Sequence, residues 1–166
     1  MIRRLLCLVP LIGVFLPVEL HAQSRLLSGP ALVVDGDTIE IHGIRIRILG
    51  MDAPESRQTC RNSDGSVWAC GQQASLALIA RIDRQSVACH SRDTDRFGRL
   101  LALCRLGDTD LGAWMVSEGW AVASRNRVSP YRAEERNARS AGRGLWNSWF
   151  EMPWDWRKRM AADRPR

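Results

Sequence analysis

The sequence predicts an α+β fold, because strand-like and helix-like segments occupy separate stretches of the chain. Strands begin near residue 31, a stretch of helix formers follows, two further strands come next, and two helices follow those. The 166 residues suffice for one domain with one core, and they contain no internal repeat or low-complexity tract. Five short strands would suit a small closed barrel. We therefore expect a five-stranded OB-type β-barrel with three helices.

The first 22 residues have the layout of a secretory signal peptide. A basic start at residues 1–4 precedes an uncharged apolar run at residues 5–18, and Ala22 supplies the small residue of a cleavage site. A membrane anchor is the alternative, but a spanning helix needs roughly 20 apolar residues, and this shorter run holds two prolines. We therefore expect an exported protein, periplasmic or secreted, without stable membrane association after cleavage. Residues 23–30 are expected to form a flexible lead-in.

The first strands are expected to form a hairpin. Residues 38–41 and 44–48 alternate on either side of His42-Gly43, which is typical of a tight turn. In that register the isoleucines of both segments share one face and would line the core. Asp37 and Arg47 would point to opposite faces of a flat hairpin. They can meet only where twist or a bulge re-aims a side chain.

Helix signals occur at three later places. Residues 72–82 are rich in helix formers, and Asp110 can cap a helix over residues 111–118. Ser129-Pro130 can start a third helix, with Ser as its cap and Pro at its first position, ending near residues 142–144.

Cysteine usage agrees with export. Four cysteines follow the leader: Cys60, Cys70, Cys89 and Cys104. An even number in an oxidising compartment predicts two disulfides, with three possible connectivities. If the expected strands at 86–90 and 100–105 form a symmetric hairpin, Cys89 lies opposite Cys104, and Cys60 would then join Cys70. Zinc binding is the weaker alternative, because the sequence has no Cys-x-x-Cys and few histidines.

The chain is basic, with a formal net charge of +6 and a pI of about 9.7. A basic exported domain attracts polyanions such as nucleic acid, although a modest positive charge also serves solubility alone. Charge therefore leaves both interpretations open.

Carboxylates and arginines gather in four short segments near turns: Asp35-Gly36-Asp37-Thr38, Arg47, Asp52-Ala53-Pro54-Glu55 and Asp95-Arg96-Phe97-Gly98-Arg99. Phosphodiester hydrolysis needs a water nucleophile, a base beside it, and positive charge on the phosphoryl oxygens. A hard cation held by oxygen ligands can supply part of that charge, and arginine forks bind phosphate in a bidentate manner. Each segment alone is typical of an ordinary turn or a solvated strand face. Their joint order and spacing favour hydrolysis.

Three of these stretches, residues 34–38, 47–55 and 93–99, closely resemble the signature segments of the staphylococcal nuclease family. The resemblance covers roughly residues 31–147, the expected nuclease domain. It implies a five-stranded OB-type barrel with three helices that cleaves DNA and RNA with calcium. Residues 148–166 form a Trp-rich and basic extension, whose tryptophans are expected to pack on the barrel while its basic residues stay solvated.

The resemblance also implies roles for individual residues. Asp37 and Asp52 would be calcium carboxylates, and Ala53 would offer a backbone carbonyl ligand. Arg47 and Arg99 would bind the phosphate, and Glu55 would orient or deprotonate the attacking water. Support behind these groups would come from Asp35, Thr38 and Asp95.

The sequence departs from the family pattern near the nucleotide. Ala53 stands where Thr is common, and Phe97 is an aromatic residue without a hydroxyl. Residues 123–126 lack the tyrosines that pack on the nucleotide, so Arg125 and Arg127 would replace aromatic contacts with phosphate contacts.

Three functions stay open at this point. A metal-dependent nuclease, expected to be monomeric with DNA or RNA as its substrate, is favoured because the carboxylates, Glu55 and the arginines are all present. A non-catalytic OB-fold nucleic-acid-binding module would be expected to lose some of them. An exported accessory or polysaccharide-linked protein could reuse the fold without phosphodiesterase activity.

Overall fold

The computed structural model describes residues 25–125 and 129–163. The expected signal peptide and Arg127 lie outside the described residues. Within the described ranges, no helix has both the length and the apolar character needed to cross a membrane.

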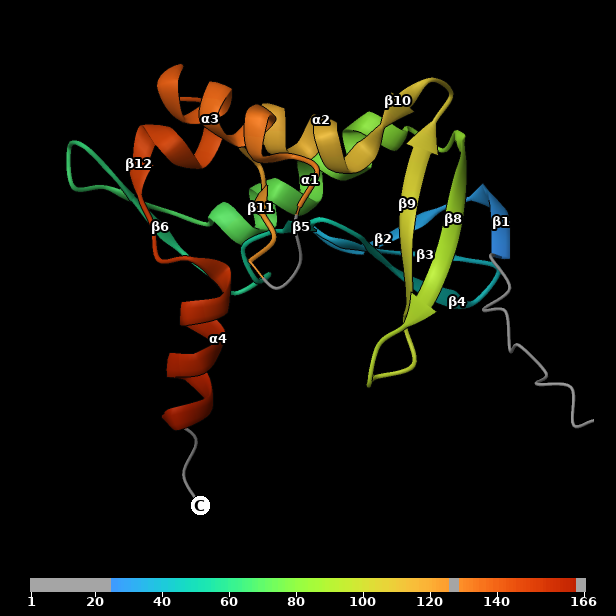
Figure 1. Cartoon of the computed structure of the whole chain (residues 1–166). Coiled ribbons are helices and arrows are strands. Elements are labelled where there is room, and N and C mark those ends of the chain that lie inside the picture. Colours follow the sequence, from blue (N-terminus) through green and yellow to red (C-terminus); the bar gives the residue numbers. More distant parts are fainter. Residues whose placement is uncertain (1–24, 126–128, 164–166) are drawn as a thin grey trace, which may run out of the picture.

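The main sheet curls around the core of the domain (Figure 1). Its neighbouring strands follow the order β1-β8-β9-β4-β3-β2, with the short β10 beside β9. The pairs are antiparallel except for β4 and β9, which run parallel. The strands are β1 (Arg25–Pro30), β2 (Leu32–Asp35), β3 (Thr38–Ile41), β4 (Ile44–Ile48), β8 (Ser86–Thr94), β9 (Leu100–Leu106) and β10 (Thr109–Asp110).

The order of the sheet explains how it closes. Its two ends, β1 and β2, are separated along the chain by Ala31 alone, so they act as one bent strand. Counted in this way, five principal strands form the OB-type barrel, and the predicted α+β fold class is confirmed. The expected flexible lead-in was wrong, because Arg25–Pro30 pairs with Ser86–Ser91 of β8. This pairing covers a strand edge that would otherwise be open.

The predicted hairpin is present as β3 and β4. His42 and Gly43 both have positive φ, 52° and 78°, which suits a two-residue turn between twisted strands. Ile39 pairs with Ile46 and Ile41 with Ile44, in the expected register. The core isoleucines are fully buried, but Ile44 is 40% exposed because it lies at the turn.

Four α-helices occur in the described part of the chain: α1 (Cys70–Ile82), α2 (Leu111–Ser117), α3 (Arg132–Ser140) and α4 (Pro153–Ala162). The Asp110 carboxylate accepts a hydrogen bond from the Ala113 amide, so the predicted cap of α2 is confirmed. Ser129 does not cap α3. Its hydroxyl accepts from the Tyr131 amide and donates to the Gly50 carbonyl, so α3 begins only at Arg132.

The C-terminal segment contains a short strand and a helix that the sequence did not predict. Strand β12 (Ser148–Trp149) pairs with β6 (Cys60–Asn62), which also pairs with β7 (Val67–Trp68). Helix α4 follows β12 and projects from the body of the molecule (Figure 1). Trp154 packs against a small buried cluster, as expected, whereas Trp149 is 72% exposed.

Two disulfides join the cysteine pairs that the sequence favoured. Cys60 is bonded to Cys70, and Cys89 to Cys104. Cys89 and Cys104 lie opposite each other on β8 and β9, as the symmetric hairpin required. Cys60–Cys70 ties β6 to the first residue of α1.

Candidate active site

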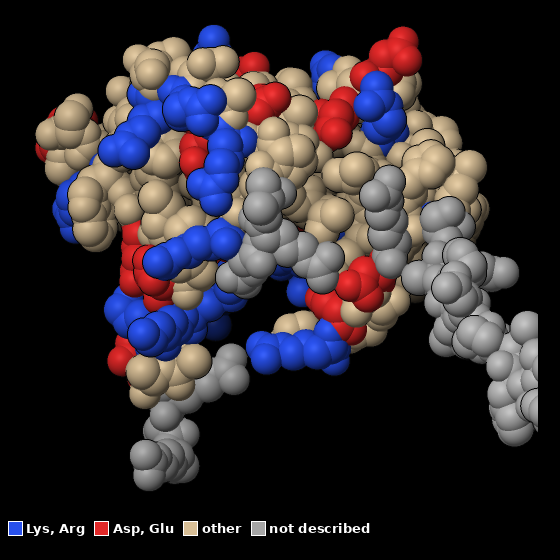
Figure 2. Space-filling model, viewed as in Figure 1, with Lys and Arg blue, Asp and Glu red and all other residues tan. Residues whose placement is uncertain are grey.

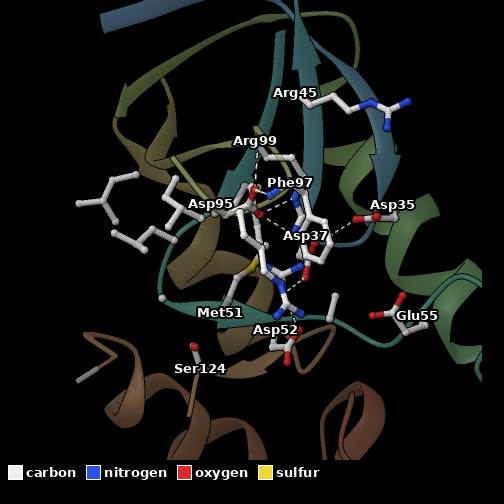
Figure 3. A pocket seen from close by; sticks show the side chains of 18 of the residues that line it. Asp35, Asp37, Arg45, Met51, Asp52, Glu55, Asp95, Phe97, Arg99 and Ser124 are labelled. Carbon is white, nitrogen blue, oxygen red and sulfur yellow. Dashed lines mark hydrogen bonds and ion pairs between the residues drawn. The ribbon is translucent and has the colours of Figure 1, made fainter. Parts of the chain in front are cut away.

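The candidate site is an open pocket of about 1370 Å³. Its walls come from the β2–β3 turn, β4, the segment around β5 (Met51–Asp52), the β8–β9 turn, part of β9 and α4. Figure 3 shows Asp37 and Asp52 near its centre, while Arg45 points away. Of the predicted site residues, the lining includes Asp35, Asp37, Arg47, Asp52, Ala53, Glu55, Asp95 and Arg99.

Asp37, Arg47 and Asp52 form a compact ionic cluster at the centre. Arg47 Nη2 lies 2.6 Å from Asp37 Oδ2 and 2.7 Å from Asp52 Oδ1. Both carboxylates are about 95% buried. Asp37 immediately precedes β3, and the register shift between Val33 and Asp35 of β2 lies across from the start of β3. The irregular strand end therefore brings together the two side chains that a flat hairpin would separate.

Neighbouring groups fix these carboxylates. The Thr38 hydroxyl donates to Asp37 Oδ1 at 2.8 Å, and Asp35 Oδ1 accepts from the Asp37 amide at 3.0 Å. Asp52 lies on β5, which pairs with Val122–Ala123 of β11. Gly50, with φ of 87°, makes the turn between β4 and β5.

Burial disfavours the ionised form of the Asp37 carboxyl. Burial raises the pKa of the Asp37 carboxyl to about 7, and the charges of Asp35 and Asp52 add to the rise. The charge of Arg47 and the hydrogen bond from Thr38 lower the pKa but do not offset the burial. An additional cation at this position would be stabilised.

The β8–β9 turn presents Arg99 to the same pocket. Arg99 Nε and Nη2 each lie 2.7 Å from Asp95 Oδ2, and Asp95 Oδ1 accepts from the amides of Phe97 and Arg99. Burial would raise the pKa of Asp95, but these hydrogen bonds and the charge of Arg99 hold it below its usual range. Arg99 Nη1 also approaches the Thr38 hydroxyl at 3.5 Å. The turn is therefore linked to the carboxylate cluster.

Phe97 is on the pocket lining and 69% exposed, with the guanidinium groups of Arg96 and Arg99 over its ring. It offers an apolar surface beside the arginines.

Glu55 lies at the edge of the cluster, on the loop after β5. Its amide donates to the buried side chain of Gln58, and its carbonyl accepts from the Gln58 amide. Gly71 packs so closely that a Cβ there would lie 1.8 Å from the Glu55 carbonyl oxygen. The backbone of Glu55 is therefore held between the loop and α1.

An arginine that the sequence analysis did not select completes the cluster. Arg157 of α4 places Nη2 2.6 Å from Asp52 Oδ2 and Nη1 2.7 Å from Glu55 Oε1. Burial would lower the pKa of Arg157, but the hydrogen bonds and charges of Asp52 and Glu55 raise it, so it stays charged. The expectation that the basic residues of the C-terminal extension are solvated was wrong for Arg157.

Comparison of the sequence with known protein families supports this assignment of the site. The sequence model described as "Staphylococcal nuclease homologue" matches residues 45–148, which is more than half of the chain. The chain belongs to the staphylococcal nuclease family. The matched range contains Arg47, Asp52, Glu55 and the β8–β9 turn, whereas Asp37 precedes it and Arg157 follows it.

Relatives of this family member carry different names. It is 33% identical to "Micrococcal nuclease" of Shigella flexneri, covering 88% of each chain. It is 26% identical to "Uncharacterized endonuclease" of Haemophilus influenzae, covering 95% of this chain and 88% of the relative. It is 34% identical to "Succinoglycan biosynthesis protein ExoI" of Rhizobium meliloti, covering 74% of this chain but 65% of that protein's length.

The residues of this nuclease-family site fit a hard cation that keeps open positions. Two carboxylate oxygens converge on one cationic atom, Arg47 Nη2, at 2.6 and 2.7 Å, and carboxylate oxygens are the ligands that a hard cation such as calcium takes. Among the described side chains, no group of three or more His, Cys, Asp or Glu could hold a metal. A cation here would therefore depend on Asp37, Asp52, backbone oxygen such as that of Ala53, water and substrate.

Proposed function

We propose that this family member is an exported, calcium-dependent nuclease that hydrolyses phosphodiester bonds in DNA, RNA or both. One observation carries the proposal: two buried carboxylates converge on a single cationic atom inside an open pocket that also presents Glu55 and Arg99. Family membership and the relatives named as nucleases support hydrolysis of nucleic acid. Calcium is what the family resemblance implies, and the carboxylate oxygens suit a hard cation of this kind.

The residues divide the work of hydrolysis between them. Arg47 and Arg99 would hold the phosphate oxygens and stabilise the charge that develops on them. Glu55 would take the proton from a water whose oxygen bonds to phosphorus, while the bond from phosphorus to the leaving oxygen breaks. A calcium ion on Asp37, Asp52 and the Ala53 carbonyl would supply further positive charge. Asp35, Thr38 and Asp95 would keep these groups in place.

Export and the monomeric state belong to the same proposal. The two disulfides are compatible with an oxidising compartment. The basic side chains gathered over α3 and α4 (Figure 2) would attract a polyanion.

The test is cleavage of single-stranded DNA and RNA by the purified protein, with calcium and with excess chelator. Cleavage that needs calcium is the expected result. A folded protein that cuts neither substrate with calcium present would rule out the enzyme. Tight, salt-sensitive binding would then favour the OB-fold binding module, and the absence of binding would favour an accessory role.

A further inference from the structure

Arg157 donates hydrogen bonds to two carboxylates that are central to the proposed chemistry. Nη2 and Nη1 lie 2.6 and 3.0 Å from Asp52 Oδ2 and Oδ1, and Nη1 also lies 2.7 Å from Glu55 Oε1. Its side chain is 37% exposed and faces the pocket. The same guanidinium therefore bridges a proposed metal ligand and the proposed base.

The position of Arg157 is built into the fold. Strand β12, which residues 150–152 connect to α4, pairs with β6, and the Cys60–Cys70 disulfide ties β6 to α1. The buried Gln58 side chain donates to the Glu151 carbonyl at 2.6 Å, and Pro153 at the start of α4 is buried. The helix that carries Arg157 is thus anchored to the loop that carries Glu55.

A metal ion and Arg157 would compete for Asp52. Arg157 contacts both oxygens of this carboxylate, and Arg47 also contacts Oδ1. A divalent cation on Asp52 needs at least one of these oxygens and repels a guanidinium beside it. Displaced from Asp52, the Arg157 side chain would remain on an anchored helix at the wall of the pocket that Arg47 and Arg99 also line. A planar guanidinium with free donors is suited to phosphate.

We propose that Arg157 is a substrate-binding residue, held on Asp52 and Glu55 in the free protein and released to a substrate phosphate when a metal ion takes Asp52. The inference rests on the proposed function and deepens it. Metal binding would then favour binding of the polyanion in two ways, because it adds a cation to the pocket and frees an arginine.

The test uses Arg157→Gln beside Lys158→Gln, which removes the same charge from an exposed neighbour on α4. Calcium binding is measured by calorimetry without nucleic acid. Arg157→Gln should bind calcium about five- to tenfold more tightly than the wild type, because a competing cation is gone. In saturating calcium, its affinity for a dye-labelled, cleavage-resistant oligonucleotide should fall about tenfold, the loss expected for one charge-assisted hydrogen bond. Lys158→Gln should match the wild type in calcium affinity and lose less oligonucleotide affinity.

Arg157→Lys keeps the charge without the fork and should fall between the wild type and Arg157→Gln in both measurements. Thermal unfolding of each variant identifies loss of folding. Unchanged calcium affinity or unchanged oligonucleotide affinity in folded Arg157→Gln overturns this inference alone. A wild type that binds neither ligand overturns the proposed function and this inference together.

Discussion

Asp52 and Arg157 are 105 positions apart in the chain, yet two hydrogen bonds of 2.6 and 3.0 Å join their side chains. Asp52 belongs to the β5 segment and Arg157 to the last helix, so the contact joins the barrel to the C-terminal extension. A nuclease domain that ended at residue 147 would lack this arginine.

Arg47 should be far more important than its neighbour Arg45. Arg47 lies between two buried carboxylates. The Arg45 side chain is 64% exposed, and its ion pair, from Nε to Glu40 Oε2, is long at 3.7 Å. We expect Arg47→Lys to reduce kcat about 10²- to 10³-fold, the loss typical of one transition-state donor. Arg45→Gln should stay within about twofold of the wild type, because exposed ion pairs contribute little. Equal losses in steady-state assays would contradict the assigned role.

The raised pKa of Asp37 predicts a pH dependence of stability. Its carboxyl has a pKa of about 7 when folded, against 3.8 for the ordinary group, so between these values the folded state holds the extra proton. The stability of the chelator-treated protein should therefore fall as pH rises from about 4 to 7, by at most about 4 kcal/mol from this group. Urea unfolding across this range should show a weaker fall for Asp37→Asn. The same pH dependence in both proteins would contradict the shift.

Removal of the two disulfides should have different effects, one on stability and the other on activity. Cys89–Cys104 joins central barrel strands across 15 residues, so its removal as a Cys→Ser pair should cost about 3 kcal/mol of stability. Cys60–Cys70 anchors the β6–β7 hairpin on which β12 and α4 depend. Its removal should lower activity at temperatures where the barrel stays folded. Thermal unfolding and cleavage assays on the two double variants distinguish these effects, and identical behaviour would count against the anchoring role.

Gly71 should be essential for placing Glu55. A Cβ at Gly71 would lie 1.8 Å from the Glu55 carbonyl oxygen, so α1 or the Glu55 loop must move. Gly71→Ala should lower kcat at least tenfold even where the protein remains folded, because misplacement of a catalytic group by about 1 Å is costly. Gln72→Ala, at the exposed next position, is the control and should be close to the wild type. Full activity in Gly71→Ala would show that the contact does not position Glu55.

The sequence predicted the parts of the fold that depend on local patterns. The β3–β4 register follows from the alternating isoleucines and the His42-Gly43 turn, and the α2 cap follows from Asp110. Strand β1 was missed because its residues, including Ser28, Gly29 and Pro30, show no alternation, and it is stabilised by pairing with β8.

The residues of the site also divide into those that local sequence patterns indicate and those that depend on contacts between distant segments. Asp37, Asp52 and Glu55 stand in recognisable local segments, so their grouping could be expected from the sequence. Arg157 could not be selected, because its importance depends on how β12 and α4 dock on the barrel, and the sequence shows only a basic tail. Gln58 was missed for a similar reason, since only the structure shows that this loop residue is fully buried.

The most direct measurement for the central claim is kcat of Glu55→Gln on single-stranded DNA in saturating calcium, beside Glu118→Gln at an exposed position outside the pocket. If Glu55 accepts the proton from the attacking water, kcat should fall by about 10²- to 10⁴-fold in Glu55→Gln and stay near the wild-type value in Glu118→Gln. A folded Glu55→Gln enzyme with wild-type kcat would contradict the account of this pocket as the hydrolytic site.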